Sequence, residues 1–153
     1  MPMPEQLQMM GQQQARAWFL FSCAASASMF LVITIASCTS TETFSQIYTM
    51  VTEFLSISRS QLSATLRGSP NLGHLLCYAL LSLSLSGVFS RRNKYLAPLV
   101  AVVFGMLMEV VQIFIPSRDS SLLDIGVNIL GIAVGFGLYR LWLTYRRRSQ
   151  GVR

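Results

Sequence analysis

The sequence contains few charged residues. They make up 12% of its 153 residues, roughly half the share usual in a soluble domain. Acidic residues are especially scarce, with six Asp and Glu against 12 Lys and Arg, and there is a single His. Hydrophobic residues make up 52%, and the mean hydropathy is +0.51. This composition excludes an ordinary soluble domain and predicts an integral membrane protein.

Sequence signatures of cofactor sites are also missing. The three cysteines, Cys23, Cys38 and Cys77, form no Cys-x-x-Cys pair, and their odd number excludes a disulfide framework. We find no phosphate-binding Gly-rich loop, no dinucleotide fingerprint and no Gly-x-Ser-x-Gly elbow. We therefore expect no cofactor and no bound metal, and leave open whether the chain is an enzyme. The net charge of +6 comes without a nucleic-acid motif, so nucleic acid is not an expected partner.

Long apolar runs are what the sequence has in abundance. A membrane-spanning helix needs about 20 apolar residues, and four stretches qualify. They lie at about residues 17–38, 71–89, 95–115 and 122–143. The fold class predicted is all-α, an integral membrane four-helix bundle formed by one domain over residues 17–144. Residues 1–14 are predicted to be a disordered cytoplasmic N-terminus, and residues 145–153 a basic cytoplasmic tail.

The basic residues predict the orientation of the bundle. Nine of them fall on one side of four spans: Arg16, Arg91, Arg92, Lys94, Arg140, Arg146, Arg147, Arg148 and Arg153. Only Arg59, Arg67 and Arg118 fall on the other side. Because cytoplasmic loops carry the excess of Lys and Arg, we expect both termini in the cytoplasm and a multi-pass protein of the cytoplasmic membrane. Membrane lipids are therefore expected partners.

The first outward segment, residues 39–69, is long for so small a protein. Its apolar residues recur at three- and four-residue steps, which predicts amphipathic helices on the outer membrane surface or a lid packed over the bundle. A second alternative concerns Cys38, because Ile35-Ala36-Ser37-Cys38 is similar to a bacterial lipoprotein signal. The apolar run before it is longer than such signals usually have, so an ordinary membrane anchor is the favoured interpretation.

Polar residues inside the spans form the candidate site. Estimated depths place one layer near the outer end and a second layer one turn deeper. The second, third and fourth spans each carry one stripe of polar or small residues at helical spacing, so the three stripes are expected to face one another. The outer layer is His74, Gln112 and Asp124; the deeper layer is Tyr78, Glu109 and Asn128; the small residues for close helix packing are Gly105, Gly131 and Gly135.

These motifs, in this order, resemble the VanZ-like family over about residues 68–140. The resemblance rests on Asn71-Leu-Gly-His74, Tyr78, Glu109-Val-Val-Gln112, Pro116-Ser-Arg118, Asp124 and Asn128-Ile-Leu-Gly131 with Gly135. Family members typically have an acidic residue and a Lys before the His, where this sequence has Asn71 and Gly73. The resemblance implies a bacterial envelope protein, in a family named after a protein associated with resistance to glycopeptide antibiotics. It supplies no reaction.

The polar cluster admits two interpretations. It is either a structural network between helices or a ligand-binding or catalytic site, because ionisable groups in a membrane are costly and commonly functional. As a site, it would bind or modify an amphiphilic envelope ligand at the outer leaflet, with Arg118 recognising a phosphate or carboxylate. The alternative function is a non-enzymatic accessory subunit of a larger membrane protein complex. A small proton-linked transporter ranks last, because the inner halves of the spans lack acidic residues.

Overall fold

The computed structural model describes residues 5–39, 46, 50, 70–89, 93–115 and 122–149. They form α1 (Glu5–Cys38), α4 (Pro70–Phe89), α5 (Leu96–Ile113) and α6 (Leu122–Ser149), with no strand among the residues described. Each helix contains a stretch long and apolar enough to cross a membrane. The predicted all-α fold with four spans is therefore confirmed, and the chain is a multi-pass membrane protein. The predicted surface helices or lid of residues 40–69 lie outside this description, apart from Gln46 and Met50.

The first and last helices are longer than the sequence analysis predicts. Helix α1 is already helical at Glu5, within the segment 1–14 for which the sequence analysis predicts disorder. The segment is rich in Gln and Met, which are good helix formers, and extending an existing helix is easier than nucleating one. For the same reason α6 continues through its arginines to Ser149 instead of ending near residue 143.

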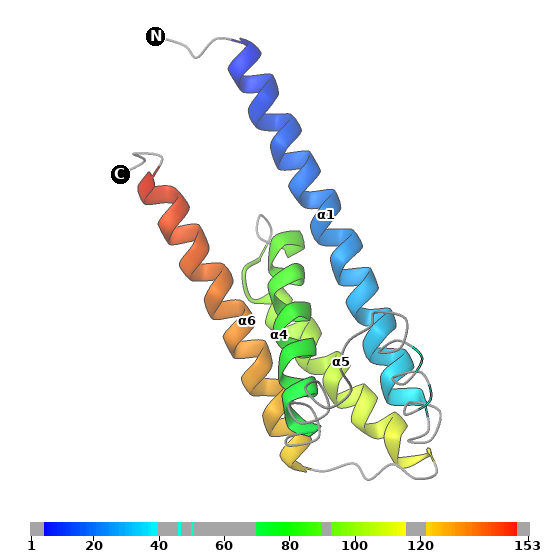
Figure 1. Cartoon of the computed structure of the whole chain (residues 1–153). Helices are drawn as coiled ribbons and strands as arrows, with labels where there is room; N and C mark the ends of the chain where they lie inside the picture. Colours follow the sequence, from blue (N-terminus) through cyan, green and yellow to red (C-terminus); the bar gives the residue numbers. More distant parts are fainter. Residues whose placement is uncertain are drawn as a thin grey trace.

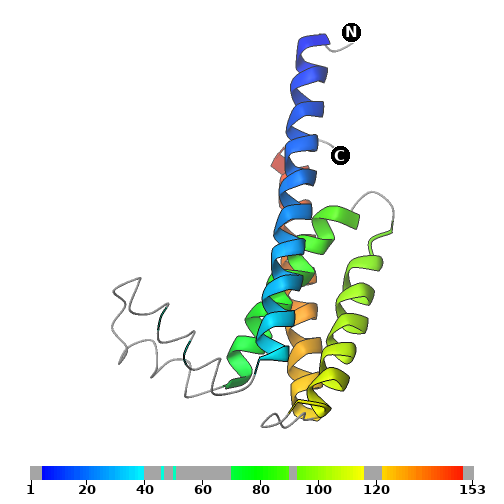
Figure 2. The same ribbon diagram turned by 90° about the vertical axis from the view of Figure 1, so that its right-hand side faces the viewer.

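The four helices are level at one end of the bundle and uneven at the other. Helices α4 and α6 begin, and α1 and α5 finish, at the lower end in Figure 1. The blue start of α1 and the red end of α6 both project beyond α4 at the opposite end (Figures 1 and 2). Trp18 of α1 and Trp142 of α6 stack with ring centroids 5.2 Å apart, and Trp18 lies near Gly87 in the last turn of α4. The two helix ends near the chain termini therefore lie on the same side of the bundle.

Helix α5 shows the polarity expected of a span in lipid. Its outward positions are large and apolar, and Leu99, Val103 and Val110 are each at least half exposed. The buried face carries the small and polar residues Ala97, Ala101, Gly105, Glu109 and Gln112. A soluble helix has the reverse arrangement, with apolar residues inside. The environment that suits α5 is therefore hydrocarbon outside and polar contacts within the bundle.

Helices α4 and α6 approach each other closely through glycine. A Cβ added at Gly131 or Gly135 would collide with the α4 main chain at Leu75 or Ala79. The hydroxyl of Ser82 donates a hydrogen bond of 2.9 Å to the main-chain oxygen of Ile132 across the same interface. Small residues let helix backbones pack closely in lipid, where no hydrophobic force drives the helices together. Two polar residues of the predicted site, His74 and Asn128, lie on this closely packed pair of helices.

Helix α1 covers the side of α4 and α5 through small and aromatic residues. Ser22 lies directly over Gly87, leaving no room for a Cβ there. Farther along, the rings of Phe30 and Phe104 meet edge to face at 4.6 Å. These contacts place α1 against the α4–α5 pair and leave α5 and α6 to meet each other on the other side of the bundle.

Candidate functional site

Three helices each contribute one side chain to a hydrogen-bonded chain near the level end of the bundle, the lower end in Figure 1. His74 lies in the second turn of α4, Glu109 one turn before the end of α5, and Asn128 in the second turn of α6. The Asn128 Nδ2 group donates to Glu109 Oε1 at 3.1 Å. The Asn128 Oδ1 atom lies 3.2 Å from His74 Nδ1. Asn128 therefore joins His74 to Glu109 and connects the two predicted layers.

The amide of Asn128 sets the direction of the whole chain. Its Nδ2 is a donor and faces a carboxylate oxygen, so its Oδ1 is the acceptor that faces the imidazole. Nδ1 of His74 must then carry the proton of that hydrogen bond. In the neutral imidazole, Nε2 is consequently unprotonated and is available as an acceptor. The direction of donation runs from His74 through Asn128 to Glu109.

Glu109 is the buried end of this chain. Its side chain is 5% exposed, and its second oxygen, Oε2, is fully buried without a hydrogen-bond partner among the groups described. Buried polar atoms are nearly always partnered, so an unpartnered carboxyl oxygen needs an explanation. The carboxyl also interacts electrostatically with Asp124 and His74. Among the described side chains, Glu109 Oε2 is the fully buried polar atom that lacks a hydrogen-bond partner.

The other predicted site residues surround this chain at different distances. Tyr78 is 2% exposed and its ring lies over Gly105, where an added Cβ would be 3.1 Å from Tyr78 Cε1. Gln112 is buried one turn beyond Glu109. Asp124 is half-buried in the first turn of α6, where a carboxylate also interacts favourably with the helix dipole. Arg118 falls outside the residues described, so the structure does not place it in the site.

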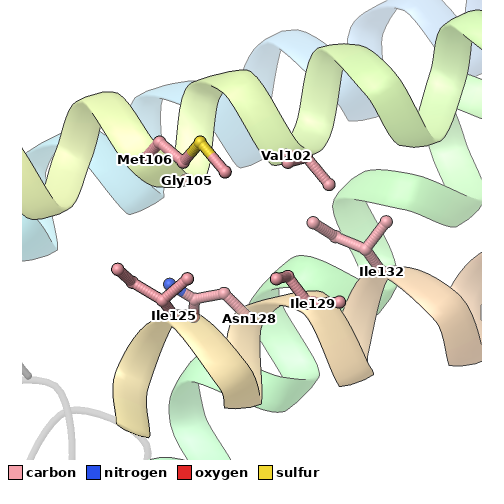
Figure 3. Close-up of a pocket in the computed structure, with 7 residues that line it drawn as sticks. All are labelled: Val102, Gly105, Met106, Ile125, Asn128, Ile129 and Ile132. Carbon is pink, nitrogen blue, oxygen red and sulfur yellow. The ribbon is translucent and has the colours of Figure 1, made fainter. Parts of the chain in front are cut away.

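A small cavity between α5 and α6 reaches the polar chain from the side. Its volume is about 10 Å³, enough for one water-sized group. Figure 3 shows residues of α5 and α6 facing each other across it, with Asn128 as the polar side chain among them. Two of its apolar residues, Met106 and Ile129, are about half exposed on the outer surface of the bundle. The full lining is Val102, Gly105, Met106, Ile125, Asn128, Ile129 and Ile132.

The described side chains do not form a metal site of the usual kind. Among the described residues, no three His, Cys, Asp or Glu side chains are grouped closely enough to hold a metal ion. The arrangement is suited instead to hydrogen bonding between an imidazole, an amide and a carboxyl group. What it offers a ligand is an acceptor oxygen on Glu109 and an imidazole nitrogen on His74.

Sequence reasoning missed two features of this region. It did not identify Asn128 as the shared partner of His74 and Glu109, because helical spacing gives faces and depths but not which side chains pair. It also missed the α5–α6 cavity. The sequence offers no distinct signal for the cavity, because most of its lining residues are apolar like those of any membrane span.

Comparison with known proteins identifies the family of the chain's membrane-spanning region. The model of the family described as VanZ/LLP1 matches residues 18–143, a range that contains all three members of the hydrogen-bonded chain. No curated protein and no solved structure matches the chain.

Proposed function

Because the chain belongs to the VanZ/LLP1 family, we propose that it is a bacterial cell-envelope protein that binds an amphiphilic ligand at the outer leaflet of the cytoplasmic membrane. The ligand would be a lipid-linked or glycopeptide-type molecule of the envelope. The distribution of basic residues supports an orientation with both termini in the cytoplasm. In this orientation the level end of the bundle, with His74, Asn128 and Glu109, faces outward.

The observation that carries the proposal is the unpartnered Oε2 atom of Glu109 at the end of a hydrogen-bonded chain. An ionisable group within a membrane helix costs at least about 2.5–3.5 kcal/mol near the centre of the bilayer. A hydrogen bond between membrane helices returns about 0.6 kcal/mol on average. Glu109 has one such bond, to Asn128, and its second oxygen has none among the described groups. A bound polar group that pairs with Oε2 would supply the missing compensation.

The test is to identify the lipids that co-purify with the protein when it is extracted from a native membrane. We expect the wild-type protein, purified in mild detergent, to retain one amphiphile enriched over the bulk membrane lipid. Replacement Asn128→Leu removes the donor to Glu109 and the acceptor for His74 together, and should lower that enrichment at least about tenfold, which corresponds to about 1.4 kcal/mol. Mass spectrometry of extracted lipids measures it. Glu109→Gln is the second variant.

The matched control is Asn93→Leu. Asn93 is exposed at the opposite end of α5, where its side chain caps the main chain of Tyr95. This variant should retain the enriched amphiphile. If Asn128→Leu inserts normally and carries the same lipids as the wild type, ligand binding by this site is contradicted. A protein partner present in fixed ratio in every preparation would instead support the accessory-subunit alternative.

A further inference from the structure

We propose that the ligand presents a hydrogen-bond donor to Glu109 Oε2, while its hydrocarbon chain lies between α5 and α6. The polar group is therefore a hydroxyl or an ammonium, and not a phosphate. This inference rests on the proposed function, because it names the chemical class of ligand for the same site. It follows from which hydrogen-bonding groups the site has already used and which it has left.

Two donors of the site, on Asn128 and His74, already face acceptors within the protein. The Nδ2 group of Asn128 donates to Glu109 Oε1, and the Nδ1 group of His74 points at Asn128 Oδ1. The unused atom, Glu109 Oε2, is a carboxyl oxygen and accepts hydrogen bonds when it is ionised. A phosphate would bring more acceptor oxygens to it. A donor would complete the network.

The charge around Glu109 favours the same class of ligand. The carboxyl groups of Glu109 and Asp124 are near enough to interact, and His74 is the basic group described beside them. Where the Glu109 carboxyl is ionised, repulsion between like charges disfavours an anionic group beside it, because water is excluded from the site. A neutral donor is accepted, and an ammonium group is attracted.

The cavity between α5 and α6 reaches Asn128, the hydrogen-bond partner of Glu109, from the lipid-facing side of the bundle. Asn128 lines the cavity and also bonds directly to Glu109, so the polar chain is adjacent to the cavity wall. The remaining wall is apolar, and Met106 and Ile129 extend to the surface that faces the hydrocarbon (Figure 3). A methylene chain suits such a wall. The cavity holds one water-sized group, so the flexible side chain of Met106 must move as the chain enters.

The experiment compares three probes with the same chain and different polar groups. The protein is placed in phosphatidylcholine nanodiscs with dodecylamine, 1-dodecanol or dodecyl phosphate at equal mole fraction. Thermal unfolding is followed for each. We expect the amine, the alcohol or both to raise Tm by about 3 °C or more at saturation, and the phosphate to leave it unchanged. A rise with dodecyl phosphate equal to that with the other probes would overturn the proposal.

Two substitutions of Glu109 assign the effect to its carboxyl group. Glu109→Leu removes the acceptor and should abolish the rise in Tm for every probe. Glu109→Gln keeps an acceptor oxygen without charge, so a rise retained with the alcohol but lost with the amine indicates that the charge attracts the ammonium. An unchanged rise in both variants excludes Glu109 as the receptor. In that case an amphiphile still lost from Asn128→Leu would leave the proposed function standing.

A matched pair on α6 tests the route. Ile129 lines the cavity, whereas its neighbour Leu130 is similarly exposed to lipid and is not part of the lining. Ile129→Trp fills the cavity mouth and should abolish the rise in Tm. Leu130→Trp adds the same ring elsewhere on the lipid-facing surface and should preserve it. Equal behaviour of the two variants contradicts binding between α5 and α6.

Discussion

Asn128 uses both ends of its side-chain amide, one toward a carboxyl group and one toward an imidazole. A side-chain amide holds a donor and an acceptor at a constant distance, and Asn is the smaller of the two residue types that carry one. Asp at this position would face Glu109 with a second carboxyl group, and Leu would leave both neighbours without a partner. The direction of the hydrogen bonds therefore depends on this one amide.

The protonation of His74 is a direct prediction of that direction. We expect neutral His74 to carry its proton on Nδ1, because Nδ1 faces the acceptor Oδ1 of Asn128. The chain contains a single histidine, so ¹⁵N-histidine labelling gives one imidazole whose two nitrogen shifts report the tautomer. In Asn128→Leu this constraint is gone, and the tautomer ratio should change. A neutral wild-type imidazole protonated on Nε2 would contradict the geometry.

The contact between α4 and α6 sets the second prediction, at the level of helices. Gly135→Ala places a Cβ against the main chain of Ala79, so the two helices must separate. We expect a loss of about 1–3 kcal/mol in the free energy of unfolding, the usual cost of overpacking. Gly137→Ala is the matched control, since nothing lies within 4 Å of its added Cβ. Its expected effect is the higher helix propensity of Ala, a stabilisation of up to about 1 kcal/mol that is opposite in sign to the loss at Gly135.

Unfolding of both variants in mixed micelles measures the difference. Equal stability of Gly135→Ala and Gly137→Ala would show that α4 and α6 are not in close contact at this level. Loss of ligand together with loss of stability in Gly135→Ala is also expected, because Asn128 is carried on the same helix as Gly135.

The elements were predictable because the bilayer imposes one length and one polarity on them. The spans predicted at about residues 71–89 and 95–115 correspond closely to α4 and α5. Pro70 marks the start of α4, and the basic segment after Phe89 marks the boundary between the two helices. The start of α1 was not predictable from hydropathy, because polar residues with high helix propensity extend a helix beyond the membrane. Hydropathy measures where lipid begins, not where a helix begins.

Contacts between elements were less predictable. The spacing of polar residues gave the inward face of α5 and α6, and the structure shows Glu109 and Asn128 buried there. The stacked pair of Trp18 and Trp142 was missed, although Trp is common at the ends of membrane spans. Pairings of this kind depend on how helices cross and slide past one another, which a single sequence does not specify.

At the scale of the whole molecule, the orientation in the membrane is the testable quantity. In a variant with Cys23, Cys38 and Cys77 replaced by Ala, we expect a cysteine at Phe114 to react with an impermeant maleimide in intact cells. Phe114 is 80% exposed just past the end of α5, at the end assigned to the outside. A cysteine at Ser149 should react only after the membrane is opened. The reverse pattern would place the site in the cytoplasm.

The unequal helix lengths have a consequence for the surrounding bilayer. Helix α5 has 18 residues, so at about 1.5 Å each it is about 27 Å long, a few ångströms short of an average hydrocarbon core. Helices α1 and α6 extend farther, but only at one end of the bundle. Lipids beside α5 must therefore compress to match it, and this local thinning brings headgroups nearer to Glu109 than the depth of the residue along α5 alone would suggest.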